Sequence, residues 1–309
     1  MSEPCLYTLT DGHADTAALS PLRGLGPLPA RLSQLIAFSI GTKPFLLGAG
    51  TDGKATLFPL LAGAPYVGPA ITLALNVGPF DQVRSFVLAN QVYLITYAAK
   101  GGDLNFLSID ADGTLSKPYR YSRQRPPALT TGWTTFETLT YLNAPYFLAY
   151  NDATGDVDLF AIRSTSVSEA GMPPLVCSNV WAWTWAKGWG HFAFFKAGGE
   201  NFFFKINTPF PNINIDHLNT DPDFRSNEVG THLTLPDWQK IGLVRAVSPD
   251  GGMPFLLAYQ PDGGLASLYR IRADCKGFTN LEQKPQQAVP NASQVATYHL
   301  DGKIFALFL

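Results

Sequence analysis

Tyr146-Phe147-Leu148-Ala149-Tyr150 leads through Asn151-Asp152-Ala153-Thr154-Gly155 into Asp156-Val157-Asp158-Leu159-Phe160-Ala161-Ile162. This arrangement of apolar strand, glycine turn and second alternating strand recurs along the chain. Another copy runs from Phe255 to Tyr259, through Gly263-Gly264, and on from Leu265 to Ile271. Further copies begin at Phe45, Tyr93 and Phe202, and a shortened one at Ile304, so successive starts differ by 48, 53, 56, 53 and 49 residues. A period of this length predicts one blade of a β-propeller per repeat.

The two ends of the chain predict how the propeller closes. The chain stops at Leu309, just after the sixth copy of the repeated strand, without the partner strand that should follow. Cys5 to Leu9 has the same form as Ser267 to Ile271, so the N-terminus can supply the outer strands of the last blade. Such a join leaves no open sheet edge at the ends. We therefore expect an all-β, six-bladed propeller with four antiparallel strands per blade.

Length and composition favour a single domain over residues 1–309. The chain is 46% apolar and 13% aromatic, which is enough to bury a large core. Only 15% of its residues are charged and the net charge is −2, so a nucleic-acid partner is not expected. No apolar run approaches the roughly 20 residues that span a bilayer, and the first residues lack the features of a signal peptide. We expect a cytoplasmic protein without a membrane span, although a removed signal peptide would make it secreted.

Motifs for common catalytic chemistries are absent from the sequence. There is no nucleophile elbow, phosphate-binding loop or dinucleotide fingerprint. The three cysteines show neither the pairing of a disulfide scaffold nor the close spacing of a zinc site. The sequence therefore predicts neither a metal site nor a bound cofactor.

Blade three shows the predicted four strands most clearly. They run from Trp133 to Leu142, from Pro145 to Tyr150, from Asp156 to Ile162, and then toward Val180. The first strand should be the innermost. Loops between strands two and three open on the same face as the links that enter the next blade, and we expect ligand on that face.

Blade four departs most from the repeat. Residues 205–212 replace the glycine turn, and we expect a longer loop there that carries the cation of Lys205. The segment from Trp181 to His191 precedes this blade and is the densest aromatic stretch of the chain. Trp181 and Trp183 alternate as in a strand, which favours packing between blades. Trp185 and Trp189 lie beside the turn and are better candidates for a ligand wall.

Polar residues on the predicted innermost strands are the candidates for binding. Arg84, Glu137, His191 and Arg245 each have apolar neighbours in the sequence. In a structural role they would satisfy one another or ordered water. In a functional role the arginines and the histidine would donate hydrogen bonds to an anionic or carbonyl oxygen, as Lys205 could.

The repeats are too unequal for a set of equivalent ligand sites. The position of Tyr150 is occupied in the six blades by Ala49, Tyr97, Tyr150, Ile206, Tyr259 and Phe308. The three tyrosines at this position favour a structural role. A multivalent lectin gains avidity by repeating its contact residues, and this chain does not repeat them. One asymmetric pocket is therefore favoured over six sugar sites.

The Trp181 to Phe192 segment, and blades of the form Pro145-Tyr146-Phe147-Leu148-Ala149-Tyr150-Asn151, resemble lectin-type six-bladed propellers. The size of the chain and its unequal blades resemble the fungal propeller hetero-Diels-Alderases of tropolone sesquiterpenoid biosynthesis. The resemblance lies in the fold and general pattern, and no catalytic motif accompanies it.

The resemblance implies a cofactor-independent pericyclase that joins a polar, tropolone-derived quinone methide to an apolar terpene such as humulene. Such a reaction needs two partners held in register. The donors would be His191, Arg245, Arg84 and Lys205. The walls would be Trp133, Trp185, Trp189 and Tyr150.

Two other functions remain open on the sequence. A glycan-binding propeller would use the same tryptophan faces to stack on sugar rings. A propeller that serves only as a platform for protein partners would carry no small-molecule pocket.

Overall fold

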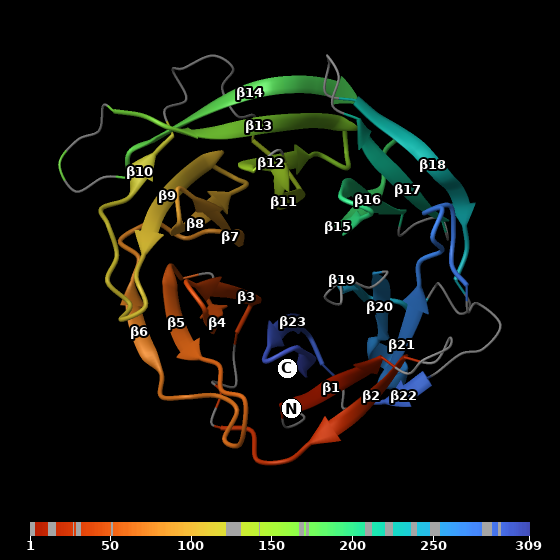
Figure 1. The fold of residues 1–309 in the computed structure, drawn as a ribbon. Helices are drawn as coiled ribbons and strands as arrows, with labels where there is room; N and C mark the ends of the chain where they lie inside the picture. The colour runs from red at the N-terminus through yellow and green to blue at the C-terminus, as the bar shows by residue number, and fades with distance from the viewer. Residues whose placement is uncertain are drawn as a thin grey trace. The chain divides into compact units, whose positions relative to one another are not determined.

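A computed structural model gives the fold of the chain (Figure 1). The residues that it describes are 4–11, 17–26, 28, 32–50, 52–121, 131–141, 143–166, 170, 173–207, 212–219, 225–235, 240–247, 254–279, 286–289 and 292–309.

The described strands form six antiparallel sheets of four strands each, which confirms the predicted six-bladed all-β propeller. Blades one to three follow one another along the chain. Blade one holds β3 (Gln34–Ile40), β4 (Lys43–Ala49), β5 (Lys54–Pro59) and β6 (Ile71–Ala74). Blade two holds β7 (Gln82–Leu88), β8 (Gln91–Ala98), β9 (Asp103–Ile109) and β10 (Tyr119–Arg120). Blade three holds β11 (Thr135–Tyr141), β12 (Ala144–Tyr150), β13 (Asp156–Ser164) and β14 (Leu175–Thr184).

Blades four and five continue the pattern. Blade four holds β15 (Trp189–Ala197), β16 (Glu200–Asn207), β17 (Asn212–Asn219) and β18 (Arg225–Leu233). Blade five holds β19 (Leu243–Val247), β20 (Phe255–Gln260), β21 (Leu265–Arg270) and β22 (Gln286–Ala288), with the short 3-10 helix η2 (Pro261–Gly263) between β20 and β21.

Blade six is shared between the two ends of the chain, as the sequence predicts. Its strands are β23 (Val295–Leu300), β24 (Lys303–Phe308), β1 (Cys5–Asp11) and β2 (Ala17–Leu22). The order across the sheet is β2-β1-β24-β23, so β1 lies between the last strand of the chain and β2 (Figure 1). Leu6 pairs with Leu307 on one side and with Leu22 on the other.

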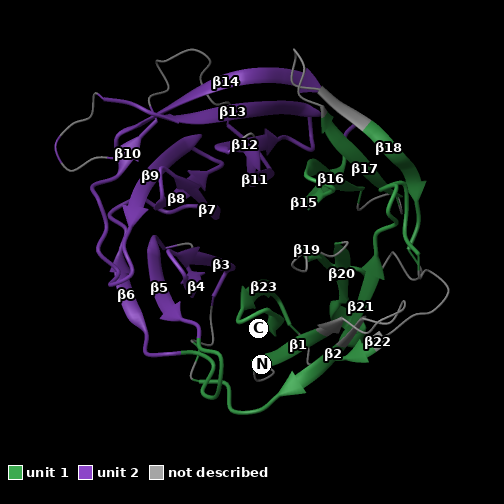
Figure 2. Ribbon diagram, viewed as in Figure 1, with its two compact units in different colours: residues 1–30, 61–67, 188–309 green, residues 31–60, 68–187 purple. Residues whose placement is uncertain are grey.

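The chain divides into two compact units of three blades each (Figure 2). Unit 1 comprises residues 1–30, 61–67 and 188–309, and unit 2 comprises residues 31–60 and 68–187. In unit 2 one apolar cluster joins blades one and two, and another joins blades two and three. In unit 1 one cluster joins blades four and five, and another joins blades five and six.

The second strand of each blade is its most buried element. In β12 every residue from Pro145 to Tyr150 is buried, and β20 is buried throughout. A strand with sheet neighbours on both edges and packing on both faces has no solvent-facing side, so it becomes a continuous apolar run. This explains why the second strands gave the clearest repeat in the sequence. No helix among the described residues is long and apolar enough to cross a membrane.

Two expectations for the neighbourhood of blade four were wrong. Trp183 does not pack between blades, because 65% of its surface is exposed. It lies near the end of the edge strand β14, beyond a register shift between Leu159 and Phe160 of the neighbouring strand. Lys205 lies within β16 and is buried, rather than in the predicted loop. Residues 208–211 of that loop are outside the described residues.

Candidate functional site

The first strands of the blades carry unlike side chains at one repeated position. The position lies two residues after the residue that faces the end of the second strand, and in the five blades of regular register it holds Ile36, Arg84, Glu137, Arg245 and Thr297. In blade four a register shift beside Trp189 breaks the correspondence, and His191 faces Ile206. A single ligand site is therefore easier to build here than a repeated one.

In unit 2, Arg84 and Glu137 join the first strands of blades two and three. Nε and Nη2 of Arg84 donate to the two carboxylate oxygens of Glu137 at 2.9 and 2.6 Å. Both side chains are about a quarter exposed. Nη1 of the arginine donates to the carbonyl of Val83 at 2.8 Å, which fixes the plane of the guanidinium. The charge of Arg84 is balanced by this bidentate pair, which makes it a weak candidate for holding an anionic ligand.

The Arg84 pair belongs to a belt of hydrogen bonds between first strands. Gln82 donates to the carbonyl of Thr134 at 3.0 Å, and Thr138 donates to the carbonyl of Ser85 at 2.9 Å. On the other side of blade two, the side-chain oxygen of Gln34 accepts from the backbone N–H of Val83 at 2.7 Å. These polar side chains therefore hold neighbouring blades of unit 2 in register.

Arg245 in unit 1 is anchored by backbone carbonyls. Its Nη1 donates to the carbonyl of Val244 at 2.7 Å, as Arg84 does to Val83. Its Nε donates to the carbonyl of Val295, on the first strand of the next blade, at 3.0 Å. The half-buried guanidinium is thus held in one orientation at an inner strand.

His191 lies on β15, in the same unit as Arg245. Its side chain is half-buried, and β15 and β19 are neighbouring first strands. Among the predicted donors, His191 and Arg245 are the two that adjacent inner strands of one unit carry.

Lys205 sits in a buried charged cluster on the sheet of blade four. Its Nζ lies 3.0 Å from Oδ2 of Asp216 and 2.8 Å from Oε1 of Glu228, and 5.2 Å from the ring centre of Trp189. Asn214 also donates to Oε1 of Glu228, at 2.8 Å. Lys205 is 3% exposed and Asp216 is fully buried, so this lysine serves the interior of the blade.

Electrostatics in this cluster favour the charged form of Glu228. Partial burial opposes ionisation of its carboxyl, but the hydrogen bond and positive charge of Lys205 outweigh that effect, with Asn214 and His232 adding to it. The pKa of Glu228 is therefore below its usual range.

The predicted walls are mostly buried. In unit 2, Trp133 and Tyr150 are core residues, while Trp185 is half-buried with its ring centre 6.1 Å from that of Tyr150. The backbone N–H of Trp185 donates to the carbonyl of Gly155 at 2.8 Å, which ties the segment to the turn of blade three. In unit 1, Trp189 is buried against Lys205. Trp185 is the predicted wall residue that retains an exposed ring surface in its unit.

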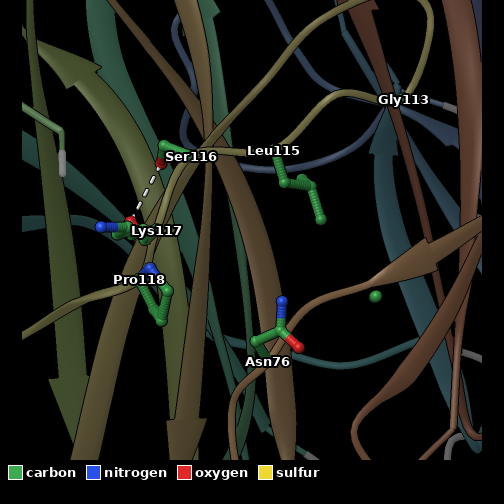
Figure 3. A pocket seen from close by; sticks show the side chains of 7 residues that line it. Asn76, Gly113, Leu115, Ser116, Lys117 and Pro118 are labelled. Carbon is green, nitrogen blue, oxygen red and sulfur yellow. Dashed lines mark hydrogen bonds between the residues drawn. The ribbon is translucent and has the colours of Figure 1, made fainter. Parts of the chain in front are cut away.

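Two open cavities lie in unit 2, and neither is lined by a predicted site residue. The first, of about 430 Å³, lies where Ala74 and Asn76 of blade one meet the segment from Leu115 to Pro118 of blade two (Figure 3). In Figure 3 the side chains of Leu115 and Asn76 line it, and the hydroxyl of Ser116 donates to the carbonyl of Lys117 at 3.1 Å.

The second cavity, of about 670 Å³, is lined by Pro79, Phe80, Asp81, Ala98, Lys100 and Gly101. It lies where the link into β7 meets the turn between β8 and β9, which are the loop types from which we expected ligand contacts. The Asp81 carboxylate accepts from the backbone N–H of Ala99 at 2.6 Å, which holds the two segments together. The only sequence signal for this cavity was the Lys100-Gly101-Gly102 turn, which resembles the turns of the other blades.

The described residues contain no group of three or more His, Cys, Asp or Glu side chains placed to bind a metal ion. The chain matches no protein-family model and no curated protein.

Solved propellers resemble the chain in fold. The periplasmic gluconolactonase PpgL of Pseudomonas aeruginosa aligns with a TM-score of 0.52 and 16% identity, over 95% of this chain and 85% of its own. A variant of AofleA from Arthrobotrys oligospora gives a TM-score of 0.51 and 10% identity, over 89% and 76%. An exo-β-1,3-galactanase of Phanerochaete chrysosporium, solved with β-1,3-galactotriose, gives 0.51 and 7% identity, over 95% and 72%. At these identities the likeness establishes the propeller fold alone.

Proposed function

We propose that the chain is a cofactor-independent pericyclase, which joins a tropolone-derived quinone methide to an apolar terpene such as humulene. The observation that carries this proposal is the inequality of the inner strands. One repeated position holds an isoleucine, two arginines, a glutamate and a threonine. Unlike groups at equivalent places suit one asymmetric substrate pair better than several copies of one ligand.

The chemistry asks little of the protein beyond placement. In a hetero-Diels-Alder reaction the C=C–C=O unit of the quinone methide adds across one C=C bond of the terpene. One C–C and one C–O bond form, three π bonds become one, and no atom is lost. Holding both partners in a reactive orientation supplies much of the rate enhancement.

Arg245 and His191 are the proposed donors to the heterodiene oxygen. Hydrogen bonds to this oxygen draw electron density from the diene and stabilise the charge that develops on it in the transition state. Arg245 is suited to this role because two backbone carbonyls already fix its guanidinium, so little reorganisation is needed. Lys205 and Arg84 are weaker donors because carboxylates already hold them.

A glycan-binding protein is the second candidate, and exposed aromatic surface favours it. Trp183 is 65% exposed, and Trp185 is half-buried in the same segment. Flat aromatic faces at a surface suit the stacking of sugar rings, and one of the similar propellers was solved with a galactotriose.

Calorimetric titration and native mass spectrometry separate these functions. The wild-type chain would be titrated with a glycan panel and, in parallel, with tropolone and a humulene-like terpene. One tropolone per chain and no sugar supports the pericyclase, whereas several sugars per chain would make the protein a lectin. Binding of neither class would favour a platform for protein partners.

Turnover of a quinone methide with humulene then tests the donors. Arg245→Met is expected to lower kcat by at least about tenfold through loss of a transition-state hydrogen bond, and His191→Gln should act in the same direction. Arg163→Met removes an exposed arginine of β13 and is the matched control. Unchanged turnover in both donor variants would refute the assignment.

A further inference from the structure

We propose that the outer edge of β14 is a self-association surface, at which two copies of the chain pair their β14 strands in antiparallel fashion. β14 is an edge strand, because the sheet order of blade three is β11-β12-β13-β14. It is also the longest strand described, with ten residues. The outer strands of blades one, two and five have four, two and three residues.

The sequence of β14 lacks the residues that normally protect such an edge. From Leu175 to Thr184 it contains no charged residue and no proline. The other two long outer strands are different: β18 contains Arg225 and Glu228, and β2 contains Pro21. Charges, prolines and short length are the usual means by which natural sheets discourage pairing at an edge. β14 therefore departs from the other outer strands in both length and composition.

The exposed apolar surface of the described residues gathers on the same strand. Four large hydrophobic side chains are exposed in the part of the chain described, and Val180 (42%) and Trp183 (65%) are two of them. Ser178, Ala182 and Thr184 are exposed as well. A tryptophan exposed beside unpaired backbone groups marks an interaction surface rather than an ordinary surface position.

A second copy of the same chain is the partner that this surface fits. Antiparallel pairing of one strand with its own copy is a twofold, self-complementary contact. With no charges along β14, the pairing opposes no like charges, and the net charge of −2 leaves little repulsion between copies. A foreign strand that carried charges would find no counter-charge on β14.

The register shift beside Leu159 limits how much of the edge can pair. It separates the stretch from Leu175 to Asn179 from the stretch from Trp181 to Thr184. The second stretch holds Trp183, and a bulge bends the strand between the two. We therefore place the pairing along Trp181 to Thr184, where Trp183 would cover the partner strand.

Sedimentation velocity over a roughly hundredfold range of protein concentration tests the proposal. The wild-type chain should pass from monomer to dimer. Trp183→Lys should raise the dissociation constant at least about tenfold, because it removes the apolar cover and sets two like charges near each other. Val87→Lys is the matched control, since Val87 is 50% exposed on β7 of the same unit, and it should leave the dimer unchanged.

Hydrogen exchange distinguishes strand pairing from a contact of side chains only. Amides of residues 181–184 should become more protected as the protein concentration rises, and Trp183→Lys should abolish that gain. The proposal is overturned by a wild-type chain that stays monomeric, by a dimer that survives Trp183→Lys or is lost in Val87→Lys, or by dimerisation without added amide protection.

Discussion

At the scale of single residues, three tyrosines act as fasteners between consecutive blades. Tyr97, Tyr150 and Tyr259 share one blade position and are all fully buried. Each hydroxyl reaches the backbone of the link into the next blade: Tyr97 accepts from the N–H of Trp133 at 3.1 Å, Tyr150 donates to the carbonyl of Ala186 at 2.7 Å, and Tyr259 accepts from the N–H of Ala292 at 2.6 Å. The structural role expected for them is thereby explained, and Tyr150 contributes to a wall only from behind Trp185.

Tyr259→Phe is expected to lower the free energy of unfolding by about 1–3 kcal/mol, because it leaves the buried N–H of Ala292 without its acceptor. Urea denaturation measures the loss. Tyr93→Phe is the control, since the described residues offer no hydrogen-bond partner to the Tyr93 hydroxyl. Equal stability of the two variants would remove the fastening role.

Asp158 supplies a test of charge at a single site. Burial raises the pKa of its carboxyl, the hydrogen bond from Asn179 at 2.7 Å lowers it, and the charge of Asp156 raises it further, with a net increase. A carboxyl whose pKa is higher in the folded state is costly to that state above this pKa, and the cost disappears as the pH falls through it.

Asp158→Asn should therefore raise the stability at pH 7 and lose this advantage as the pH is lowered through the folded-state pKa of Asp158. Urea denaturation at a series of pH values measures the difference, with the exposed Asp262→Asn as control. A gain that does not depend on pH would show that the effect is not electrostatic.

At the scale of elements, the second and third strands of a blade could be predicted and the outer strands could not. β12 was expected from Pro145 to Tyr150 and begins one residue earlier, and β13 begins at Asp156 as expected. These strands are buried, so their apolar pattern is complete. The alternation of Trp181 and Trp183 correctly indicated a strand, but at a sheet edge alternation does not decide burial.

The candidate site was predictable only in part for a similar reason. The repeat placed Arg84, Glu137, His191 and Arg245 on first strands, where the structure has them. Their partners come from other blades or from the backbone, such as the carbonyl of Val295 for Arg245. A single sequence carries no signal for contacts of that range.

The charged cluster of blade four gives a prediction for an element. Lys205→Met is expected to lower the free energy of unfolding by about 3–5 kcal/mol, because the fully buried Asp216 loses its counter-charge. Adding Asp216→Leu should recover much of the loss, since an apolar pair of similar size needs no compensation. Chemical denaturation of the single and double variants measures both effects, and a double variant no more stable than Lys205→Met would contradict this account.

At the scale of the whole molecule, the fold depends on a pairing between the two ends of the chain. β1 has strand neighbours on both sides, β24 and β2, so its backbone groups are committed to both ladders. Without β1, the edge of β24 would be open, and β24 is apolar from Ile304 to Phe308. The N-terminal strand therefore completes blade six and also covers an edge that would otherwise invite aggregation.

Thr8→Pro tests this closure directly. Thr8 pairs with Phe305 of β24 and Ser20 of β2, so a proline there removes an N–H from the middle of a sheet and should destabilise the chain by about 3 kcal/mol or more. Thr8→Ala keeps the N–H and should cost no more than about 1 kcal/mol. Thermal unfolding and light scattering would be followed together, because the exposed β24 edge should make the proline variant aggregate below the unfolding temperature of the alanine variant. A proline variant that unfolds and scatters like the alanine variant would show that β1 does not hold the two ends of the chain together.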